Sequence, residues 1–401
     1  MWSPQSAKPA ALSLCGALVL TALTTAGAPT FAKSGTARAT TSSAAVVDSA
    51  GAAPQVRVRT VVAGLEIPWD VQPLPGGSLL VTERDKARLS VVRAGTRRTV
   101  RFPRSKVWVA GETGLMSLAI DPSFAATRNF WTCQGWNTGA GHDIRVSLWR
   151  LSASERRARL VNHVVTELPT TSGRHGGCRL LLDSRSDALF IGTGDAADPA
   201  NPRSLTSLGG KVLRVHRRTG AAMEGNPYVD ASNPRQRLVY TYGHRNVQGL
   251  AQRPSDGAIV SVEHGSYRDD EVNALSPGAD FGWSPGPGYD ESVPMTDQAL
   301  PGTQTEAIWS SGTPTIATSG AAWTSGSRWG AYDAALAVAA LGSERLIFIR
   351  FDESLGQISV STPDAMRRYG RLRSVTSLSN GDLLVTTSNG VDDRILRVSP
   401  R

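Results

Sequence analysis

The sequence predicts an all-β fold, a six-bladed β-propeller, from its composition and from a repeated strand–turn–strand unit. The 401 residues include 40 glycines, 23 prolines and 10 tryptophans, and long helical patterns are few. This composition is typical of many short strands joined by tight turns. A β-rich chain of this length often forms a single domain.

The repeated unit is an apolar strand, a polar turn and a second, strongly apolar strand. Four clear copies and two weaker ones occur, at residues 71–82, 181–191, 254–262 and 378–386, and around 119–123 and 335–338. Their spacing is about 40–70 residues, in or above the range of propeller blades. Radial repetition protects strand edges and leaves a central channel. A pair of β-sandwiches is the structural alternative, but its turns are not expected to repeat the same sequence pattern.

The N-terminal segment predicts export. Lys8 is the only charge before an apolar run at residues 9–23, and small residues follow, which is typical of a signal peptide over residues 1–32. The run is too short and too interrupted for a membrane span. Cleavage after Ala28 and cleavage after Ala32 both stay open. We therefore expect a secreted protein, with association with the cell envelope as a further expectation.

Residues 33–54 are rich in Ala, Ser and Thr and carry almost no bulky apolar side chains, which predicts a flexible linker. The propeller domain is then residues 55–401. Two cysteines, Cys133 and Cys178, remain in it, and an even pair in an oxidising compartment favours a disulfide. Two buried free thiols are the alternative, because the sequence does not give the distance between them.

The formal net charge of +9 favours acidic partners. The basic residues are scattered, and only short clusters such as Arg156-Arg157 and Arg217-Arg218 occur. An aromatic-interleaved basic stripe is absent from the sequence, so we expect no nucleic-acid partner.

The segment 172–195 carries the first candidate for chemistry. His175 stands in a glycine-rich turn before an apolar strand, and Asp195 closes the next glycine turn. A lone histidine is more often structural than catalytic. Here, however, the glycines allow a ligand to approach the backbone, and Asp195 could orient the imidazole. The alternative for Asp195 is a simple turn in which the carboxylate binds its own backbone.

Three later segments carry polar groups suited to ligands. The run 242–250 places Arg245, Asn246 and Gln248 together, which suits an anionic or polyoxygenated ligand or a polar turn between blades. The loop 263–271 offers carboxylates and glycine-flanked carbonyls, which suit Ca²⁺ or a solvated acidic loop. Strand alternation at residues 371–373 would put two guanidinium groups on one face.

Several common motifs are absent from the sequence: a P-loop, a dinucleotide-binding fingerprint, a Gly-x-Ser-x-Gly elbow and a zinc-type spacing. Hydride chemistry would therefore need a cofactor other than a Rossmann-bound nucleotide.

The order of the motifs is more specific than any one of them. Along the chain they are Gly64–Asp70, Gly111–Met116, His175–Leu180, Gly192–Asp195, Gly243–Leu250, Glu263–Gly265 and Phe281–Trp283. This order resembles the soluble PQQ-dependent glucose/sorbosone dehydrogenase family, which includes the soluble aldose sugar dehydrogenases. The resemblance covers nearly all of residues 57–399.

The resemblance implies a six-bladed propeller with pyrroloquinoline quinone (PQQ) and Ca²⁺ on its top face. His175 would take the proton from the C1 hydroxyl of an aldose, Asp195 would orient His175, and hydride would pass from C1 to the quinone, giving a lactone. Arg245 would stabilise negative charge on the quinone oxygen. The implied cofactor contacts are Glu112, Arg245, Asn246, Gln248, Arg371 and Arg373. The implied calcium ligands are the carbonyls of Gly265 and Ser266 for a cofactor-bound ion, and Glu271, the Phe281 carbonyl and Glu291 for a structural ion.

This chain departs from the family pattern at the cofactor. Where many members carry a lysine that contacts PQQ, Gly342 stands here, and Ser266 replaces the usual proline after Glu-His-Gly. The main functional interpretation of the sequence is a PQQ- and calcium-dependent aldose dehydrogenase with an unidentified electron acceptor. The alternative, which Gly342 favours, is a non-catalytic propeller that binds carbohydrate or protein at the cell envelope. A calcium-dependent hydrolase would need converging carboxylate and Asn ligands that the sequence does not show.

Overall fold

The computed structural model describes residues 55–401. The predicted signal peptide (residues 1–32) and linker (33–54) lie outside the described residues.

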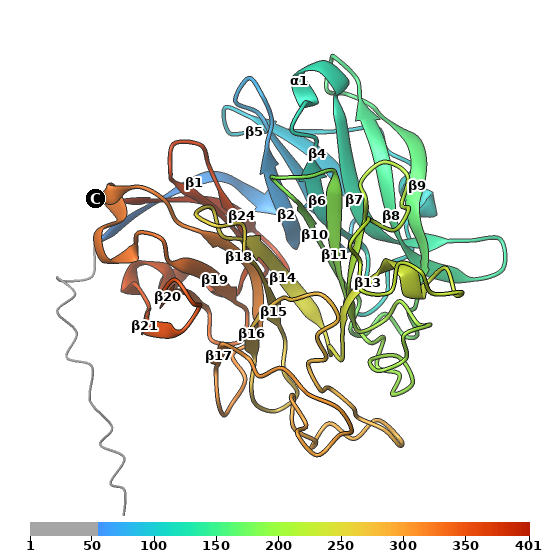
Figure 1. Ribbon diagram of the computed structural model, residues 1–401. Coiled ribbons are helices and arrows are strands. Elements are labelled where there is room, and N and C mark those ends of the chain that lie inside the picture. Colours follow the sequence, from blue (N-terminus) through green and yellow to red (C-terminus); the bar gives the residue numbers. More distant parts are fainter. Residues whose placement is uncertain (1–54) are drawn as a thin grey trace, which may run out of the picture. The chain divides into compact units, whose positions relative to one another are not determined.

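Six four-stranded antiparallel sheets form the blades, numbered here in chain order (Figure 1). Blade 1 contains β2 (Pro68–Pro73), β3 (Leu79–Glu83), β4 (Arg88–Arg93) and β5 (Thr96–Thr99). Blade 2 contains β6 (Leu115–Ile120), β7 (Asn129–Asn137), β8 (His142–Leu151) and β9 (Ala158–Leu168). Blade 3 contains β10 (Gly177–Leu182), β11 (Ala188–Thr193), β12 (Lys211–His216) and β13 (Val239–Tyr242).

The second half of the chain forms the other three blades. Blade 4 contains β14 (Val247–Gln252), β15 (Ile259–Glu263), β16 (Glu271–Ala274) and β17 (Trp309–Ser310). Blade 5 contains β18 (Thr318–Trp323), β19 (Leu336–Ala340), β20 (Arg345–Phe351) and β21 (Gln357–Ser361). Blade 6 contains β22 (Leu372–Ser377), β23 (Leu383–Thr387), β24 (Asp393–Pro400) and the N-terminal β1 (Val56–Leu65).

Helical segments are short and lie in connections. They are α1 (Phe124–Thr127) and four 3₁₀ turns, η1 (Arg104–Lys106), η2 (Gln236–Leu238), η3 (Ser327–Tyr332) and η4 (Asp364–Tyr369). Within residues 55–401, no helix has the length and apolar character needed to cross a membrane.

Strand β1 closes the ring. It pairs with β24 at the other end of the described chain, with Val58 opposite Val398, and Figure 1 shows the blue β1 beside the red β24. The first strands of successive blades contact one another, and the contact of β2 with β22 completes the circle. The six-bladed propeller predicted from the sequence is therefore confirmed.

The repeated sequence unit marks one structural position, the connection between the first and second strands of a blade. In blades 1, 4 and 6 this connection contains Gly77, Gly257 and Gly381, with φ of 82°, 83° and 86°. This left-handed conformation favours glycine, which explains why these three copies share a glycine before the second strand, whereas the copy at residues 181–191 has none.

A second repeated feature was not visible in the sequence. The first strand of every blade carries a register shift against the second strand near its start, between Pro68/Asp70, Leu115/Leu118, Gly177/Arg179, Val247/Gly249, Thr318/Ala321 and Leu372/Val375. Such bulges redirect side chains and are common beside active sites. Trp69, Gln248 and Arg373 lie within three of the bulges and are buried.

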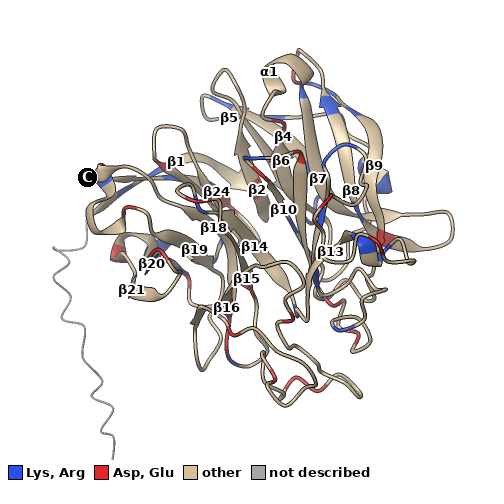
Figure 2. Cartoon of the chain, in the orientation of Figure 1, with Lys and Arg blue, Asp and Glu red and all other residues tan. Residues whose placement is uncertain are grey.

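Charged side chains are dispersed over the blades (Figure 2). Many are paired locally: Arg88 and Arg97 bind Glu83, and Arg397 binds Asp382. The charges of these three arginines are thus compensated within single blades, while the net charge of the chain stays positive.

A disulfide joins blades 2 and 3. Cys133 on β7 and Cys178 on β10 are both fully buried, and their Cα atoms are 5.6 Å apart. The predicted pairing is therefore present. Cys178 lies three residues after His175, so the bond also fixes the start of β10, the strand that follows the histidine turn.

Reduction of this disulfide should lower stability without changing the fold. The bond closes a loop with a sequence separation of 45 residues, for which chain entropy gives about 4 kcal/mol. Urea unfolding with and without a phosphine reductant should show a loss of about 2–4 kcal/mol in the free energy of unfolding. The double variant Cys133→Ala/Cys178→Ala is the control and should not respond to reductant. Equal stability of the reduced and oxidised wild type would contradict this account.

Candidate active site

The turn before β10 brings His175 against the end of β11. His175 has a φ of 50° and is 3% exposed. A Cβ atom on Gly194 would lie 1.8 Å from the His175 carbonyl oxygen, so only glycine allows the two turns to approach this closely. A histidine held in the left-handed region is locally strained, a feature that clusters at functional sites.

His175 is bound to Asp195, as predicted. Its Nδ1 lies 2.9 Å from Asp195 Oδ1, which also accepts the N–H of Ala197 at 2.8 Å. The other carboxylate oxygen, Oδ2, accepts the indole N–H of Trp283 at 2.8 Å. An ionised carboxylate only accepts, so this arrangement places a proton on Nδ1 and leaves the lone pair of the imidazole on Nε2.

Tyr289 joins His175 and Asp195 in this cluster, and it was not predicted from the sequence. Its hydroxyl lies 2.7 Å from Asp195 Oδ2 and 2.8 Å from His175 Nδ1. Burial, and then the charge of Asp195, raise the pKa of the phenol well above its usual range, so the hydroxyl keeps its proton. Tyr289 belongs to the connection between β16 and β17, where no motif marks it; Trp283 was noted only as part of a motif.

Lys211 fixes the connection that follows Asp195. Its fully buried ammonium donates to the carbonyls of Asn201, Pro202 and Gly209 at 2.7, 2.9 and 2.6 Å. Burial lowers its pKa to about 7, while the three carbonyls match the three N–H bonds of the charged form. The Asn201 side chain in turn donates to the Asp195 carbonyl at 2.8 Å, so Lys211 stabilises the Asp195 turn through Asn201.

A polar network links the histidine to blades 2 and 4. Asn246 Oδ1 accepts the N–H of Gly177 and the amide of Gln248, both at 3.0 Å. Glu112 accepts the N–H of His175 at 3.1 Å and the Asn246 amide at 3.3 Å. The structure therefore brings together three predicted cofactor contacts, Glu112, Asn246 and Gln248, beside His175.

Two buried guanidinium groups lie at the centre of the ring. Arg373 donates to Gln248 Oε1 at 2.8 Å, and Arg179 donates to Asp70 Oδ2 at 2.9 Å. Both stack near the Trp69 ring, with their central carbons 5.6 and 4.1 Å from its centroid. A cavity of about 280 Å³ extends from Asp70 and Arg179 between the first strands. Arg179 belongs to the His175–Leu180 motif, but its contacts with Asp70 and Trp69 were not predicted from the sequence.

The positive charge at this centre is not fully compensated. Burial, followed by the charges of Arg84, Arg179 and Arg371, lowers the pKa of Arg373 to about 9, although Glu112 opposes the shift. The Nε of Arg373, the Nε of Arg245 and an Nη2 of Arg179 are buried without a hydrogen-bond partner among the described residues. Buried unpaired donors are costly, so this centre is suited to an anionic ligand with several oxygens.

Arg371 and Arg373, the predicted pair, differ in burial. Strand β22 begins at Leu372, after Arg371, and a bulge lies at Arg373. Arg373 is buried and Arg371 is exposed, but the charge of Arg371 helps to lower the pKa of Arg373, and Arg371 stays a predicted cofactor contact.

Arg245 faces the same region from blade 4. It donates to the His264 carbonyl at 3.0 Å and to Glu291 Oε1 at 2.5 Å. Glu291 also binds Arg174 at 2.7 Å. Burial opposes ionisation of Glu291, but the hydrogen bonds from these two arginines outweigh it and lower the pKa of the carboxyl.

Glu291, predicted as a calcium ligand, is bound to arginines in this structure. Its carboxylate is held by two guanidinium groups, because the β16–β17 connection carries it towards Arg245. No group of three or more His, Cys, Asp or Glu side chains in residues 55–401 is arranged to hold a metal ion.

Glu271, by contrast, lies in a buried acidic cluster. Burial, and then the nearby charge of Glu263, raise the pKa of Glu271 well above its usual value. Asn273 donates to Glu271 at 3.2 Å, while its own Oδ1 is buried without a partner in the described part of the chain. His244 binds Glu263 at 2.8 Å and stacks on Phe281, which places Phe281 in the same cluster. Two buried carboxylates and a free amide oxygen suit a hard cation.

The other predicted metal-binding segment shows a tight turn. The Gly265 carbonyl lies 2.8 Å from His264 Nδ1, and the Gly265 N–H donates to Asp270 at 2.8 Å. Ser266, beside it, is partly exposed. Binding of a cation at the Gly265 carbonyl would have to displace the imidazole, so these two ligands stay a prediction.

Gly342 lies two residues after the end of β19, and its backbone is closely packed. Its N–H donates to the Ile316 carbonyl at 2.8 Å, and a Cβ would lie 3.0 Å from the same oxygen. A lysine at this position would therefore require the β17–β18 connection to shift.

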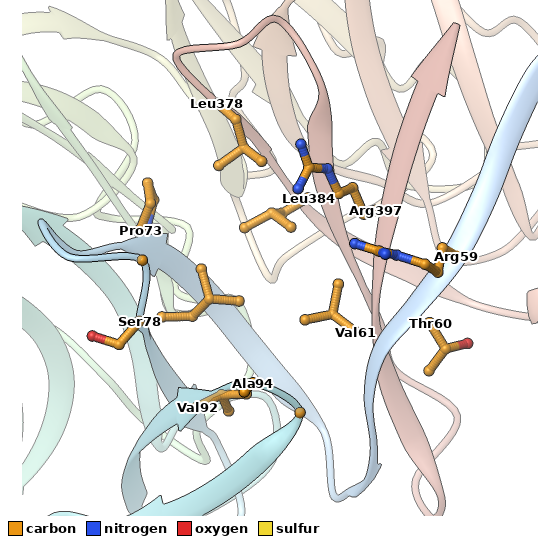
Figure 3. Close-up of a pocket in the computed structure, with 13 residues that line it drawn as sticks. Arg59, Thr60, Val61, Pro73, Ser78, Val92, Ala94, Leu378, Leu384 and Arg397 are labelled. Carbon is orange, nitrogen blue, oxygen red and sulfur yellow. The ribbon is translucent and has the colours of Figure 1, made fainter. Parts of the chain in front are cut away.

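A separate cavity of about 550 Å³ lies between blades 1 and 6 (Figure 3). Figure 3 shows Arg59 and Arg397 near its apolar walls, which include Val61, Leu378 and Leu384. None of the predicted site residues lines it. The chemistry-bearing side chains converge instead at the opposite ends of the first strands, around His175 and Arg373.

Comparison with known proteins agrees with this geometry. The chain is 28% identical over 359 residues to an aldose sugar dehydrogenase of Escherichia coli K12, which covers 86% of this chain and 93% of the relative. The PQQ-bound aldose sugar dehydrogenase of Streptomyces coelicolor superposes with a TM-score of 0.72 at 29% identity, covering 88% of this chain and all of that one. The apo-form soluble aldose sugar dehydrogenase of E. coli gives a TM-score of 0.76 at 26% identity, covering 86% of this chain and all of that one.

A family model described as Glucose / Sorbosone dehydrogenase matches residues 65–397, which is most of the propeller. The chain belongs to the glucose/sorbosone dehydrogenase family.

Proposed function

We propose that this protein is a secreted, PQQ- and calcium-dependent dehydrogenase that oxidises aldose sugars at C1 to lactones and passes the electrons to an acceptor not yet identified. The observation that carries the proposal is that the Asn246–Gln248 network links the His175–Asp195 pair to Arg373, one of three arginines with buried donors unpaired in residues 55–401.

The residues present fit an anionic quinone. PQQ carries carboxylates and quinone oxygens, and Arg373, Arg179 and Arg245 have buried N–H groups without partners in residues 55–401. Asn246 and Gln248 add amide groups at the same place. These five residues would hold the cofactor, and bound PQQ would supply a two-electron acceptor for hydride. Similarity to the PQQ-bound S. coelicolor enzyme supports this choice of cofactor.

The protein's own contribution is proton removal and charge stabilisation. His175 presents Nε2 as a base for the C1 hydroxyl, because Asp195 holds the Nδ1 proton. Arg245 offers a fixed positive charge where negative charge develops, and a preorganised charge needs no rearrangement during the reaction. The Arg245–Glu291 ion pair restrains this guanidinium and offsets part of its charge.

Calcium and export are further parts of the proposal. Glu271, Glu263 and the free Asn273 oxygen support a calcium site in blade 4. The buried Cys133–Cys178 disulfide supports an oxidising compartment, in agreement with the predicted signal peptide.

The first test is reconstitution of the purified protein with PQQ and Ca²⁺, followed by dye reduction across a panel of aldoses. We expect a cofactor spectrum and sugar-dependent reduction. If both are missing, the dehydrogenase proposal fails, and carbohydrate binding without PQQ would then favour the non-catalytic propeller.

Substitution of His175 by Ala should retain PQQ binding while turnover falls by about 10²–10⁴-fold, because the general base is lost. Steady-state kinetics and a PQQ titration on the same preparation measure both quantities. His216→Ala, at the far end of β12, is the control and should turn over normally. Unchanged turnover in His175→Ala would remove this residue from the mechanism.

Arg373→Met should stabilise the cofactor-free protein and weaken cofactor binding. Removal of a buried, undercompensated charge is expected to raise the free energy of unfolding by about 1–4 kcal/mol. Loss of its charge-assisted hydrogen bonds should weaken PQQ binding by about 10- to 100-fold. The control Arg371→Met concerns an exposed side chain and should change stability by less than about 0.5 kcal/mol. A destabilised Arg373→Met variant with normal PQQ affinity would contradict this account.

Calcium should stabilise the wild type through Glu271. At a hundredfold excess over Kd, ligand binding adds about 2.7 kcal/mol to the free energy of unfolding. The raised pKa of Glu271 means that its stabilising contribution is present below the unfolded pKa and is lost as pH rises through the folded value, so the gain from calcium should grow with pH.

Urea unfolding with and without Ca²⁺ checks this prediction. Glu271→Gln should lose the response, whereas Glu291→Gln should keep it, because Glu291 is bound to arginines. The reverse pattern would restore Glu291 as the ligand.

A further inference from the structure

Tyr289 closes a ring of hydrogen bonds with His175 and Asp195. Its hydroxyl lies 2.8 Å from His175 Nδ1 and 2.7 Å from Asp195 Oδ2, while Nδ1 itself lies 2.9 Å from Asp195 Oδ1. A protonated phenol has one proton to donate, and an ionised carboxylate only accepts. The Tyr289 proton is therefore directed to Asp195, and the oxygen lone pair faces the Nδ1–H of His175.

The ring of Tyr289 is held independently of its hydroxyl. Its centroid lies 5.9 Å from that of His175 and 6.3 Å from that of Trp283, and the Arg174 guanidinium carbon lies 5.8 Å above it. Removal of the oxygen alone should leave these contacts in place. The hydroxyl and the ring are thus separable by a Tyr→Phe change.

We propose that Tyr289 is a positioning residue for the dehydrogenase reaction: its hydroxyl bridges Asp195 and His175, fixes the imidazole with its Nδ1–H turned inward, and so directs Nε2 towards the substrate. The inference rests on the proposed function and deepens it. Asp195 keeps Trp283 and Ala197 as partners without Tyr289, whereas His175 loses its second acceptor at Nδ1. The imidazole, rather than the carboxylate, is therefore the group that Tyr289 restrains.

The first experiment needs no cofactor. Proton NMR of the cofactor-free protein should show a low-field Nδ1–H resonance, assigned to His175 by its loss in His175→Gln. It should persist in wild type and in the control Tyr228→Phe, whose residue lies outside the site in the β12–β13 connection. In Tyr289→Phe it should broaden by exchange or move upfield, with the thermal unfolding midpoint close to that of wild type. A resonance unchanged from wild type would overturn the proposal.

The second experiment uses the PQQ-loaded enzyme. Tyr289→Phe should lower kcat by about tenfold, the value of one hydrogen bond to a charged group, with KM and PQQ affinity within about twofold of wild type. In the Asp195→Asn background the same change should have little further effect, because the two residues act through one histidine. Equal losses in both backgrounds, or a loss confined to PQQ affinity, would refute a positioning role.

The two proposals fail differently. A wild type that binds PQQ but oxidises no aldose would refute the proposed function, while the NMR comparison would still decide whether Tyr289 restrains His175. Conversely, an active wild type with an unaltered Tyr289→Phe variant would refute only the role of Tyr289.

Discussion

Buried positive charge at the centre of the ring constrains the rest of this structure. Arg373 and Arg179 lie buried against Trp69, and Asp70 forms an ion pair with only one of them, Arg179. Their unpaired N–H groups are a liability for folding unless an anion completes them. The propeller supplies the rest of the stability through apolar blades, ring closure by β1 and the disulfide, and so tolerates a strained, charged centre, as enzymes commonly do.

The bulge at the start of each first strand shapes the charged centre of the ring. In blade 3 it follows the His175 turn, in blade 4 it contains Gln248, and in blade 6 it contains Arg373. The same bulge, repeated in each blade, therefore contributes different side chains to the centre of the ring. The chemistry differs from blade to blade while the fold stays regular, in keeping with function as a property of sites carried by a common architecture.

The sequence was sufficient for the fold and for half of the site. The turns that end at Gly77, Gly257 and Gly381 repeat because each requires a residue in the left-handed conformation. This repeat of glycine turns made the blades predictable from the sequence. The pairing of His175 with Asp195 followed from motif order and was found in the structure. Local patterns did not reveal Tyr289, because its loop carries no repeat and its role depends on a contact across 94 residues of sequence.

Two differences from expectation have the same physical origin. Arg371 and Arg373 differ in burial because β22 begins after Arg371 and a bulge interrupts the strand at Arg373. Glu291 was expected near Glu271, but its loop turns towards Arg174 and Arg245, and carboxylates bind guanidinium groups readily. In both cases the position of a charged side chain depends on irregular backbone. The periodicity of the sequence does not describe such backbone. Lys211 was overlooked for a related reason, since its carbonyl partners belong to a connection without periodicity.

In the proposed function, one site both binds the quinone and removes the proton from the sugar. This can be tested by anaerobic addition of an aldose to the PQQ-reconstituted protein, with the quinone absorbance followed in a single turnover. We expect stoichiometric loss of the oxidised quinone spectrum, one equivalent per equivalent of sugar oxidised. A bound quinone that stays oxidised in the presence of every aldose would contradict it.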